Sequence, residues 1–262
     1  MMDKLSIVPS RAGRREWIGL AVLALPTLLL SLDMSVLYLA MPQLAEDLAP
    51  SSTQFLWIMD IYGFLIAGFL VTMGTLGDRI GRRKLLMIGA AAFGIASMLA
   101  AYSSSAEMLI VNRALLGIAG ATLMPSTLAL ISNMFKDPGQ RGIAISVWMS
   151  CFMVGVAIGP LIGGLLLEQF WWGSVFLLGV PIMLLLLIAA PLLLPEYRDS
   201  KAEKMDLASV GLFLAAILPI VYGLKEFAKA GALEWQPVAL LLFGGLVAVW
   251  FVRRQQTLTS PL

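Results

Sequence analysis

The sequence of 262 residues contains no histidine, a single cysteine and few charged residues. Without histidine, an imidazole base and metal sites built on histidine are excluded. Cys151 alone can neither form an intramolecular disulfide nor hold a zinc ion or an iron–sulfur cluster. Only 13% of the residues are charged, about half the share in a soluble domain, so a water-soluble globule is not expected. The net charge of +2 is too small to suggest a nucleic-acid partner.

Apolar residues dominate the chain and occur in long runs. They make up 60% of the sequence, and the mean hydropathy is +0.90. Windows of about 19 residues find eight apolar segments near the ~20 residues that a helix needs to cross a bilayer. The segments are Trp17–Leu39, Phe55–Leu76, Leu85–Tyr102, Met108–Ile131, Gly142–Leu167, Trp172–Leu194, Leu207–Leu224 and Trp235–Val252. The sequence therefore predicts an all-α polytopic membrane protein in contact with the lipid bilayer.

Basic residues before the first apolar segment would also fit a secretory signal peptide. However, the segment Trp17–Leu39 is longer than the apolar core of a typical signal peptide, and it contains Asp33. Seven more apolar segments follow it. We therefore interpret it as the first transmembrane helix.

A polar stretch, PEYRDSKAEKMD, interrupts the apolar pattern over residues 195–206. Elsewhere the connections are short, which is typical of a compact bundle of sequential helices. We expect a tail over residues 1–16, a six-helix N-terminal bundle over 17–194, a linker over 195–206, two additional transmembrane helices over 207–252 and a second tail over 253–262.

The distribution of lysine and arginine predicts the orientation. With the N-terminus inside, 15 of the 18 lysines and arginines fall in inner segments, two in outer loops and one, Arg113, inside a span. Because positively charged loops stay in the cytoplasm, we expect both tails and the linker to be cytoplasmic and the chain to lie in the inner cell membrane. Tryptophans at predicted span ends agree with an aromatic belt: Trp17, Trp57, Trp171, Trp172 and Trp235.

Three charged side chains lie inside predicted spans: Asp33, Asp60 and Arg113. Each would cost roughly 2.5–3.5 kcal/mol at the centre of an inserted helix. We therefore expect each to face a wet cavity or a partner rather than lipid. All three lie in the outer halves of their spans, which would allow them to share one cavity.

Two interpretations stay open for each of these residues. Asp33 either takes up a proton or a cation, or it is a structural carboxylate paired with Arg113 or a backbone group. Asp60 lies closer to the outer interface and either assists Asp33 or is solvated. Arg113 either pairs with a carboxylate in a proton relay or joins two helices. Gly117 and Gly120 follow on the same face of its helix, which allows another backbone to approach.

A glycine- and arginine-rich loop, GTLGDRIGRRK, follows the second span over residues 74–84. Its distinctive members are Gly74, Asp78, Arg79, Gly81, Arg82 and Arg83. A positive-inside loop explains the basic residues but not the Asp-Arg pair or the glycine spacing. The fourth span adds Arg113 and Gly117 in the pattern R-x-x-x-G. Together these motifs resemble the major facilitator superfamily of secondary transporters, in which this loop joins helices 2 and 3 and docks on the second half of the protein.

The fifth span carries GVAIGPLIGG over residues 155–164. Its glycines and proline are Gly155, Gly159, Pro160, Gly163 and Gly164. In a soluble helix these residues would cost roughly 7 kcal/mol, so close packing or a required kink must compensate. Within the superfamily the pattern resembles the signature of antiporters, and the resemblance implies a kinked, leak-tight helix at the interface between the two halves.

Two further patterns resemble the 14-helix drug:proton antiporters. LDMSVLYLAMP over residues 32–42 is similar to L-D-x-T-x-x-x-x-A-x-P, with Ser35 in place of threonine, and WIMDIY over 57–62 is similar to the start of helix 2 in quaternary-ammonium exporters. The resemblance implies proton-coupled export of lipophilic cations such as quaternary ammonium compounds and dyes. Adaptable contacts to such cations could come from residues that otherwise belong to the core or the lipid-facing surface: Met34, Tyr38, Tyr62, Phe64 and Met124.

The resemblance covers the first part of such a transporter. A 14-helix member has six helices, a two-helix insert and six more helices, whereas this sequence matches the first six and the insert. We therefore expect a truncated chain, possessing an N-terminal six-helix major-facilitator bundle plus two further transmembrane helices. The alternatives to an antiporter are a non-transporting half-bundle that needs a partner chain, and a solute uniporter or symporter of the same fold. We expect no enzyme, no metal and no cofactor, because no nucleophile–base pair, phosphate-binding loop or metal cluster is recognisable.

Overall fold

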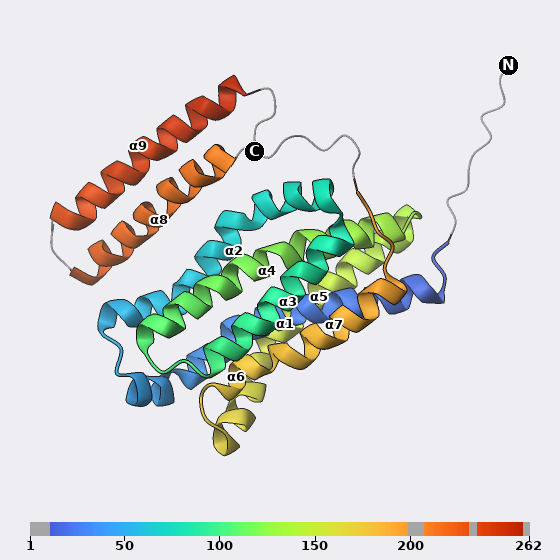
Figure 1. Cartoon of the computed structure of the whole chain (residues 1–262), viewed down its shortest axis with the longest axis horizontal. Coiled ribbons are helices and arrows are strands. Elements are labelled where there is room, and N and C mark those ends of the chain that lie inside the picture. Colours follow the sequence, from blue (N-terminus) through green and yellow to red (C-terminus); the bar gives the residue numbers. More distant parts are fainter. Residues whose placement is uncertain (1–10, 199–206, 231–234, 259–262) are drawn as a thin grey trace.

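The computed structural model describes residues 11–198, 207–230 and 235–258. Most of the predicted linker and parts of both predicted tails lie outside the described residues. The ranges left out are 1–10, 199–206, 231–234 and 259–262. Over the described ranges the chain forms nine α-helices (Figure 1). They are α1 Arg14–Leu48, α2 Ser52–Ile80, α3 Arg82–Ala101, α4 Ala106–Met134, α5 Pro138–Gln169, α6 Ser174–Leu177, α7 Gly179–Leu193, α8 Leu207–Ala230 and α9 Trp235–Thr257.

Polar residues in the short connections cap the helices. The side chains of Ser51, Ser105 and Asp137 accept hydrogen bonds from backbone N–H groups in the first turns of α2, α4 and α5. Such caps satisfy donors that a helix start leaves without a partner. Pro138 follows Asp137 as the first residue of α5, where its missing N–H costs nothing.

Seven helical segments are long and apolar enough to cross a membrane, counted over the described residues. The all-α membrane architecture is thereby confirmed. The apolar part of α8, Ala208–Leu224, is shorter than these seven. The sixth span, Ser174–Leu193, is divided into α6 and α7. Helix α6 ends at Leu177, because Pro181 has no N–H that could donate a helical hydrogen bond to the carbonyl of Leu177.

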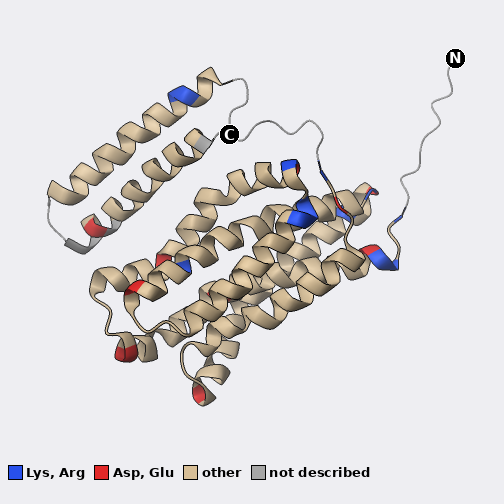
Figure 2. Cartoon of the chain, in the orientation of Figure 1, with Lys and Arg blue, Asp and Glu red and all other residues tan. Residues whose placement is uncertain are grey.

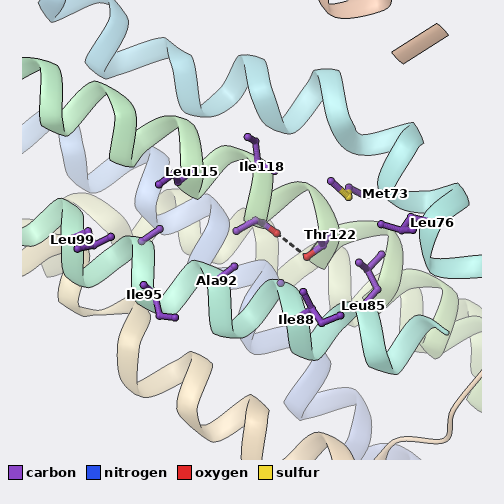
Figure 3. A pocket seen from close by; sticks show the side chains of 13 residues that line it. Met73, Leu76, Leu85, Ile88, Ala92, Ile95, Leu99, Leu115, Ile118 and Thr122 are labelled. Carbon is purple, nitrogen blue, oxygen red and sulfur yellow. Dashed lines mark hydrogen bonds between the residues drawn. The ribbon is translucent and has the colours of Figure 1, made fainter. Parts of the chain in front are cut away.

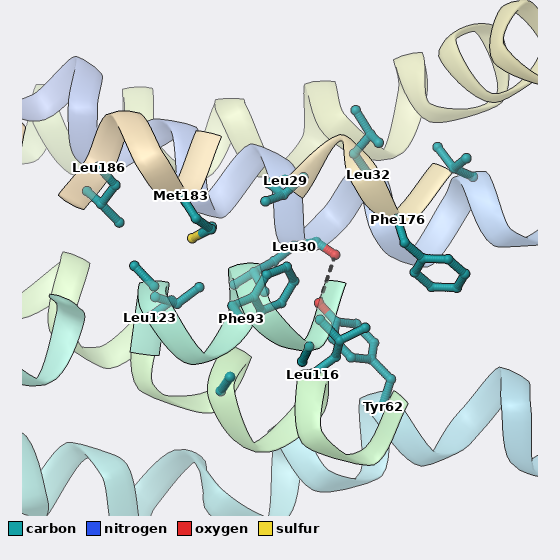
Figure 4. Packing of buried hydrophobic residues seen from close by; sticks show 14 of the residues in the cluster. Leu29, Leu30, Leu32, Tyr62, Phe93, Leu116, Leu123, Phe176, Met183 and Leu186 are labelled. Carbon is teal, nitrogen blue, oxygen red and sulfur yellow. Dashed lines mark hydrogen bonds between the residues drawn. The ribbon is translucent and has the colours of Figure 1, made fainter. Parts of the chain in front are cut away.

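The first seven helices form one bundle around a shared apolar core. Helix α1 packs mainly on α5, α2 on α4, and α3 on α4 and α7. Figure 4 shows Leu30, Tyr62, Phe93 and Met183 meeting between these helices. All four side chains are buried, so they belong to the apolar core of the bundle.

Helices α8 and α9 pack on each other beside α2 (Figure 1). Gly68 of α2 makes room for this contact, because a Cβ atom there would lie 2.5 Å from Leu214 Cδ2. The rings of Trp57, near the start of α2, and Tyr222, in the second half of α8, stack with their centroids 5.4 Å apart.

Basic side chains gather at one end of the bundle. Figure 2 shows Lys and Arg concentrated where α1 begins and where α2 turns into α3. Acidic side chains dominate the opposite end (Figure 2). Arg113 is buried inside the bundle. The charge asymmetry of the sequence is therefore an asymmetry between the two ends of the folded bundle.

Candidate functional site

Asp33 and Arg113 form an ion pair inside the bundle. Helix α1 supplies Asp33, α4 supplies Arg113, and Arg113 Nη1 lies 2.6 Å from Asp33 Oδ2. The side chain of Arg113 is 1% exposed and that of Asp33 is 9% exposed. A buried pair of this kind is sensitive to the loss of either member, because the remaining charge would be left without a partner at a cost of about 3–5 kcal/mol.

Helices α2 and α6 complete the surroundings of Arg113. Its Nε donates a hydrogen bond of 3.1 Å to the backbone carbonyl of Ile58. Its guanidinium carbon lies 4.4 Å from the ring centroid of Tyr62 and 5.9 Å from that of Phe176. Both contacts fall within cation–π range. Arg113 therefore makes attractive contacts with α2 and α6 in addition to its ion pair with Asp33.

Tyr62 links the ion pair to the backbone of α1. Its hydroxyl donates to the carbonyl of Leu30 at 3.4 Å, a contact drawn in Figure 4. Because Leu30 lies one helical turn before Asp33, Tyr62 touches both the helix of the carboxylate and the guanidinium.

Asp60 lies in a different pocket from this pair. It lines a small space between α2 and α8 together with Trp57, Phe64, Tyr222 and Glu226. The expected single cavity for Asp33, Asp60 and Arg113 thus differs from the structure, which brings only the first and last together. Residues 58 and 60 lie on different faces of α2, so the carbonyl of Ile58 meets Arg113 while Asp60 lies toward α8.

The glycines after Arg113 bring α2 close to α4. A Cβ atom on Gly117 would lie 2.6 Å from the backbone oxygen of Tyr62. Gly120 meets side chains instead, with Leu30 Cδ2 at 3.1 Å and Ile66 Cδ1 at 3.3 Å from an added Cβ. Gly117 therefore sets the backbone approach that places Tyr62 under Arg113.

Three of the four glycines in the α5 motif face α1. Added Cβ atoms would lie 2.4 Å from the carbonyl oxygen of Leu28 at Gly155, 1.8 Å from Ser35 Oγ at Gly159 and 2.9 Å from Val36 Cγ1 at Gly163. Gly164 has no such neighbour within 4 Å. The spacing of four residues forms a smooth helix face on which α1, the helix of Asp33, packs.

The turn between α2 and α3, residues 78–83, is held by charged contacts. Asp78 Oδ1 accepts from Arg82 Nε at 2.8 Å and lies 2.6 Å from Arg82 Nη2. Gly81 has a φ of +111°, which side-chain-bearing residues rarely adopt. Arg79 is exposed at the end of α2. A Cβ atom added to Gly74 would lie 3.9 Å from Pro125 Cβ, which is ordinary van der Waals contact.

The segment after α7 lies against this turn. The backbone N–H of Arg82 donates to the carbonyl of Tyr197 at 2.8 Å, and that of Arg83 donates to Glu196 Oε1 at 3.0 Å. Arg83 Nη1 also donates to the carbonyl of Leu194 at 2.9 Å. In this chain the loop motif therefore contacts the end of its own bundle, at residues that sequence reasoning missed.

Comparison with known proteins connects these features to a family. A model described as the Major Facilitator Superfamily matches residues 23–261. The chain belongs to the major facilitator superfamily. Membership places it among transport proteins rather than enzymes. In the described residues there is also no group of three or more cysteine, aspartate or glutamate side chains that could hold a metal ion.

The similar members of this superfamily are drug-resistance proteins. The chain is 49% identical over 253 residues to Multidrug efflux pump LfrA of Mycolicibacterium smegmatis, a match that covers 97% of this chain and 50% of the pump. It is 39% identical over 248 residues to Methyl viologen resistance protein SmvA of Salmonella typhimurium, covering 95% and 50%. The chain spans about half the length of the curated relatives it matches.

A solved structure shares the superfamily fold. The crystal structure of the peptide transporter POT in complex with sulfate matches with a TM-score of 0.66 over 91% of this chain and 52% of that chain. The sequence identity is 19%, so this likeness concerns the fold alone.

Two glycines of the superfamily loop motif differ sharply in their surroundings, which gives a matched test. Replacing Gly81 by alanine combines a φ of +111° with a Cβ atom 2.7 Å from Glu196 Oε1. We expect Gly81→Ala to cost about 1–3 kcal/mol and to lower the melting temperature in detergent by several degrees. Gly74→Ala should leave it unchanged, and equal melting temperatures of the two variants would contradict the described turn.

Glu196 could have been anticipated from one signal. It lies in the sequence PEYR at the end of the sixth span, on the same predicted side as the basic loop. An acid at that position has five basic residues as candidate partners: Arg79, Arg82, Arg83, Lys84 and Arg198. The sequence alone does not identify the partner of Glu196, because its ion pair with Arg83 depends on how α7 packs on α3.

Proposed function

We propose that this chain carries the proton- and cation-binding bundle of a drug:proton antiporter that exports lipophilic cations. The observation that supports it most is the buried contact of Asp33 with Arg113 at 2.6 Å. A carboxylate inside a membrane bundle is expensive, and such residues mark ion and proton pathways. The antiporter-like glycine motif on α5 and the drug-resistance relatives add support.

In the proposed mechanism Asp33 has three exclusive partners. Its carboxylate is neutralised by Arg113, by a proton or by a cationic substrate. When a proton or substrate replaces Arg113, the guanidinium keeps the carbonyl of Ile58 and the ring of Tyr62 as partners. Because proton and substrate compete for one carboxylate, inward movement of one is coupled to outward movement of the other.

The proton gradient supplies enough free energy for such an exchange. A membrane potential of about 120 mV and a pH difference of about 0.5 give roughly 3.5 kcal/mol per proton. A monovalent cation moves outward against the same potential, so in a one-for-one exchange the potential cancels and the pH difference alone sustains a cation gradient of about threefold. Uncoupler-sensitive ethidium efflux from cells expressing the chain tests the proposed function directly.

We propose lipophilic cations as the substrate class because an anionic group beside aromatic rings recognises organic cations. The names of the relatives, which include multidrug efflux, methyl viologen resistance and puromycin resistance, support a small-molecule substrate. Exposed side chains of α1, Met34 and Tyr38, offer adaptable apolar contact near Asp33.

We further propose that export needs a second bundle, supplied by the same or another chain. Helix α5 supports this, because only 17% of the residues in its most apolar stretch are buried. The side chains that it exposes include Met153, Val156 and Leu161. A half-bundle that pairs with a partner chain is therefore the second candidate function. Cross-linking in membranes followed by mass measurement tests the pairing, since an unpaired chain runs at 28.3 kDa and a chain paired with a second copy or another protein runs at a higher mass. Efflux measured alongside shows whether the paired form transports.

For the orientation we propose an inner-membrane location with both ends in the cytoplasm. In a Cys151→Ala background, Ser104→Cys in the α3–α4 connection should react with a membrane-impermeant maleimide in intact cells. Lys136→Cys in the α4–α5 connection should react only after permeabilisation, because the basic end of the bundle faces inward. Labelling of position 136 but not of position 104 in intact cells would show the opposite orientation.

A further inference from the structure

An apolar groove runs along α3. It has a volume of about 380 Å³ and lies between α3, α4 and the end of α2 (Figure 3). Its walls include Met73, Ile88, Ala92, Ile95, Leu115 and Ile118. The one hydroxyl among the lining residues, that of Thr122, donates to the carbonyl of Ala119 at 2.7 Å. The groove therefore suits a hydrocarbon chain and offers nothing to a polar ligand.

The groove opens toward the membrane. Ile88 and Ile95 are 51% and 55% exposed although they are apolar, and they belong to a membrane-length helix. From Leu85 to Leu99 the groove follows α3 over about 21 Å at 1.5 Å per residue. One leaflet of the hydrocarbon core is about 15 Å deep. The groove is therefore long enough to hold a lipid acyl chain over the full depth of one leaflet.

Two basic side chains flank the end of the groove at the α2–α3 turn. Lys84 precedes Ile88 by four residues and Ile95 by eleven, which puts all three on one face of α3. Arg79 follows the groove residue Leu76 by three residues on α2. Both basic side chains are exposed, and neither makes an ion pair with a residue in the described ranges.

The neighbouring arginines are already neutralised. Arg82 pairs with Asp78 at 2.6 Å, and Arg83 pairs with Glu196 at 3.6 Å. The positive charge left at the mouth of the groove is therefore that of Arg79 and Lys84, which are both exposed. Figure 2 shows Lys and Arg in blue where α2 turns into α3. An anionic group beside them would be attracted from the adjacent leaflet.

We propose that this groove binds an anionic phospholipid from the leaflet at the α2–α3 turn. One acyl chain lies along α3 between Leu85 and Leu99, and the phosphate lies between Arg79 and Lys84. The site is independent of the Asp33–Arg113 pair and does not require the chain to be a drug exporter.

Native mass spectrometry of the detergent-purified chain, mixed with equal amounts of phosphatidylglycerol and phosphatidylcholine, tests the headgroup site. We expect the wild type to retain phosphatidylglycerol about thirtyfold better, since each basic side chain near an anionic headgroup contributes about a factor of five. Arg79→Gln with Lys84→Gln should abolish the preference. Lys136→Gln with Arg141→Gln, which removes the same charge at the same end of the bundle, should keep it.

A second pair of variants tests the acyl site. Ala92→Trp fills the groove from an exposed position on its wall and should remove retention of phosphatidylglycerol. Ile188→Trp places the same side chain at a 69% exposed position on α7 and should not. Equal retention of both lipids by the wild type, or a preference that survives Arg79→Gln with Lys84→Gln, would overturn the proposal. A dimer mass that disappears in Ala92→Trp would also overturn it, because a second copy would then occupy the groove.

Discussion

Cells that express the Asp33→Asn variant are expected to lose uncoupler-sensitive ethidium efflux, down to the level of cells without the protein. Asparagine has nearly the shape of aspartate but carries no charge and cannot exchange a proton near neutral pH. It therefore cannot alternate between Arg113, a proton and a cation, which in the proposed mechanism is the step that couples export to the proton gradient. The measurement is the ethidium fluorescence decrease after energisation, with and without an uncoupler, at matched membrane levels.

Two controls separate coupling from folding in this experiment. Asp137→Asn removes another carboxylate but keeps a good helix cap for α5, so efflux should be unchanged. Asp33→Asn leaves Arg113 buried without a carboxylate, which could also lower membrane levels. The double variant Asp33→Asn with Arg113→Gln removes both charges, should restore membrane levels and should still lack efflux. Efflux that persists in well-inserted Asp33→Asn would contradict the role of Asp33.

Replacing Gly155 by alanine is expected to have a large effect on stability. The new Cβ atom would lie 2.4 Å from the backbone oxygen of Leu28 and 2.0 Å from Ser31 Oγ. The serine can rotate away, but the carbonyl belongs to α1 and moves only with the helix. Overpacking of this kind costs about 1–3 kcal/mol or more, so the melting temperature in detergent should fall by roughly 5–10 °C.

The same helix supplies the matched control for this variant. Gly164 lies nine residues further along α5 and has no atom within 4 Å of an added Cβ. Gly164→Ala should leave the melting temperature unchanged or raise it slightly, since alanine is the better helix former. If the two alanine variants melted alike, α1 and α5 would not pack through the Gly155 face.

Much of the fold could be predicted from hydropathy, because the bilayer imposes one length and one polarity on every span. Helices form at each of the eight predicted apolar segments, and the family that the motifs resemble is confirmed. The broken sixth span was not predicted, since a window of average hydropathy does not register a single missing N–H at Pro181. The long ends of α1, from Arg14 to Leu48, were not predicted either.

The site was less predictable than the fold because it depends on tertiary contacts. A charged residue inside a span indicates that a partner exists, but Asp33 and Arg113 are 80 residues apart and periodicity does not identify the pair. Asp60 has the same sequence signature as Asp33 and lies in another pocket. Tyr62 was predicted either to contact a cation or to belong to the core or the lipid-facing surface, and no prediction was made for Phe176. The folded helices bring both rings next to Arg113.

The most direct test of the central claim is the pH dependence of ethidium binding to the purified chain. If proton and cation compete for Asp33, ethidium affinity should weaken as the pH is lowered, with a limiting slope of about tenfold per pH unit for one competing proton. The chain has no histidine, so no imidazole contributes to this slope. In Asp33→Asn the affinity should be weaker and independent of pH. A wild-type affinity that does not change with pH, or the same slope in Asp33→Asn, would contradict the account.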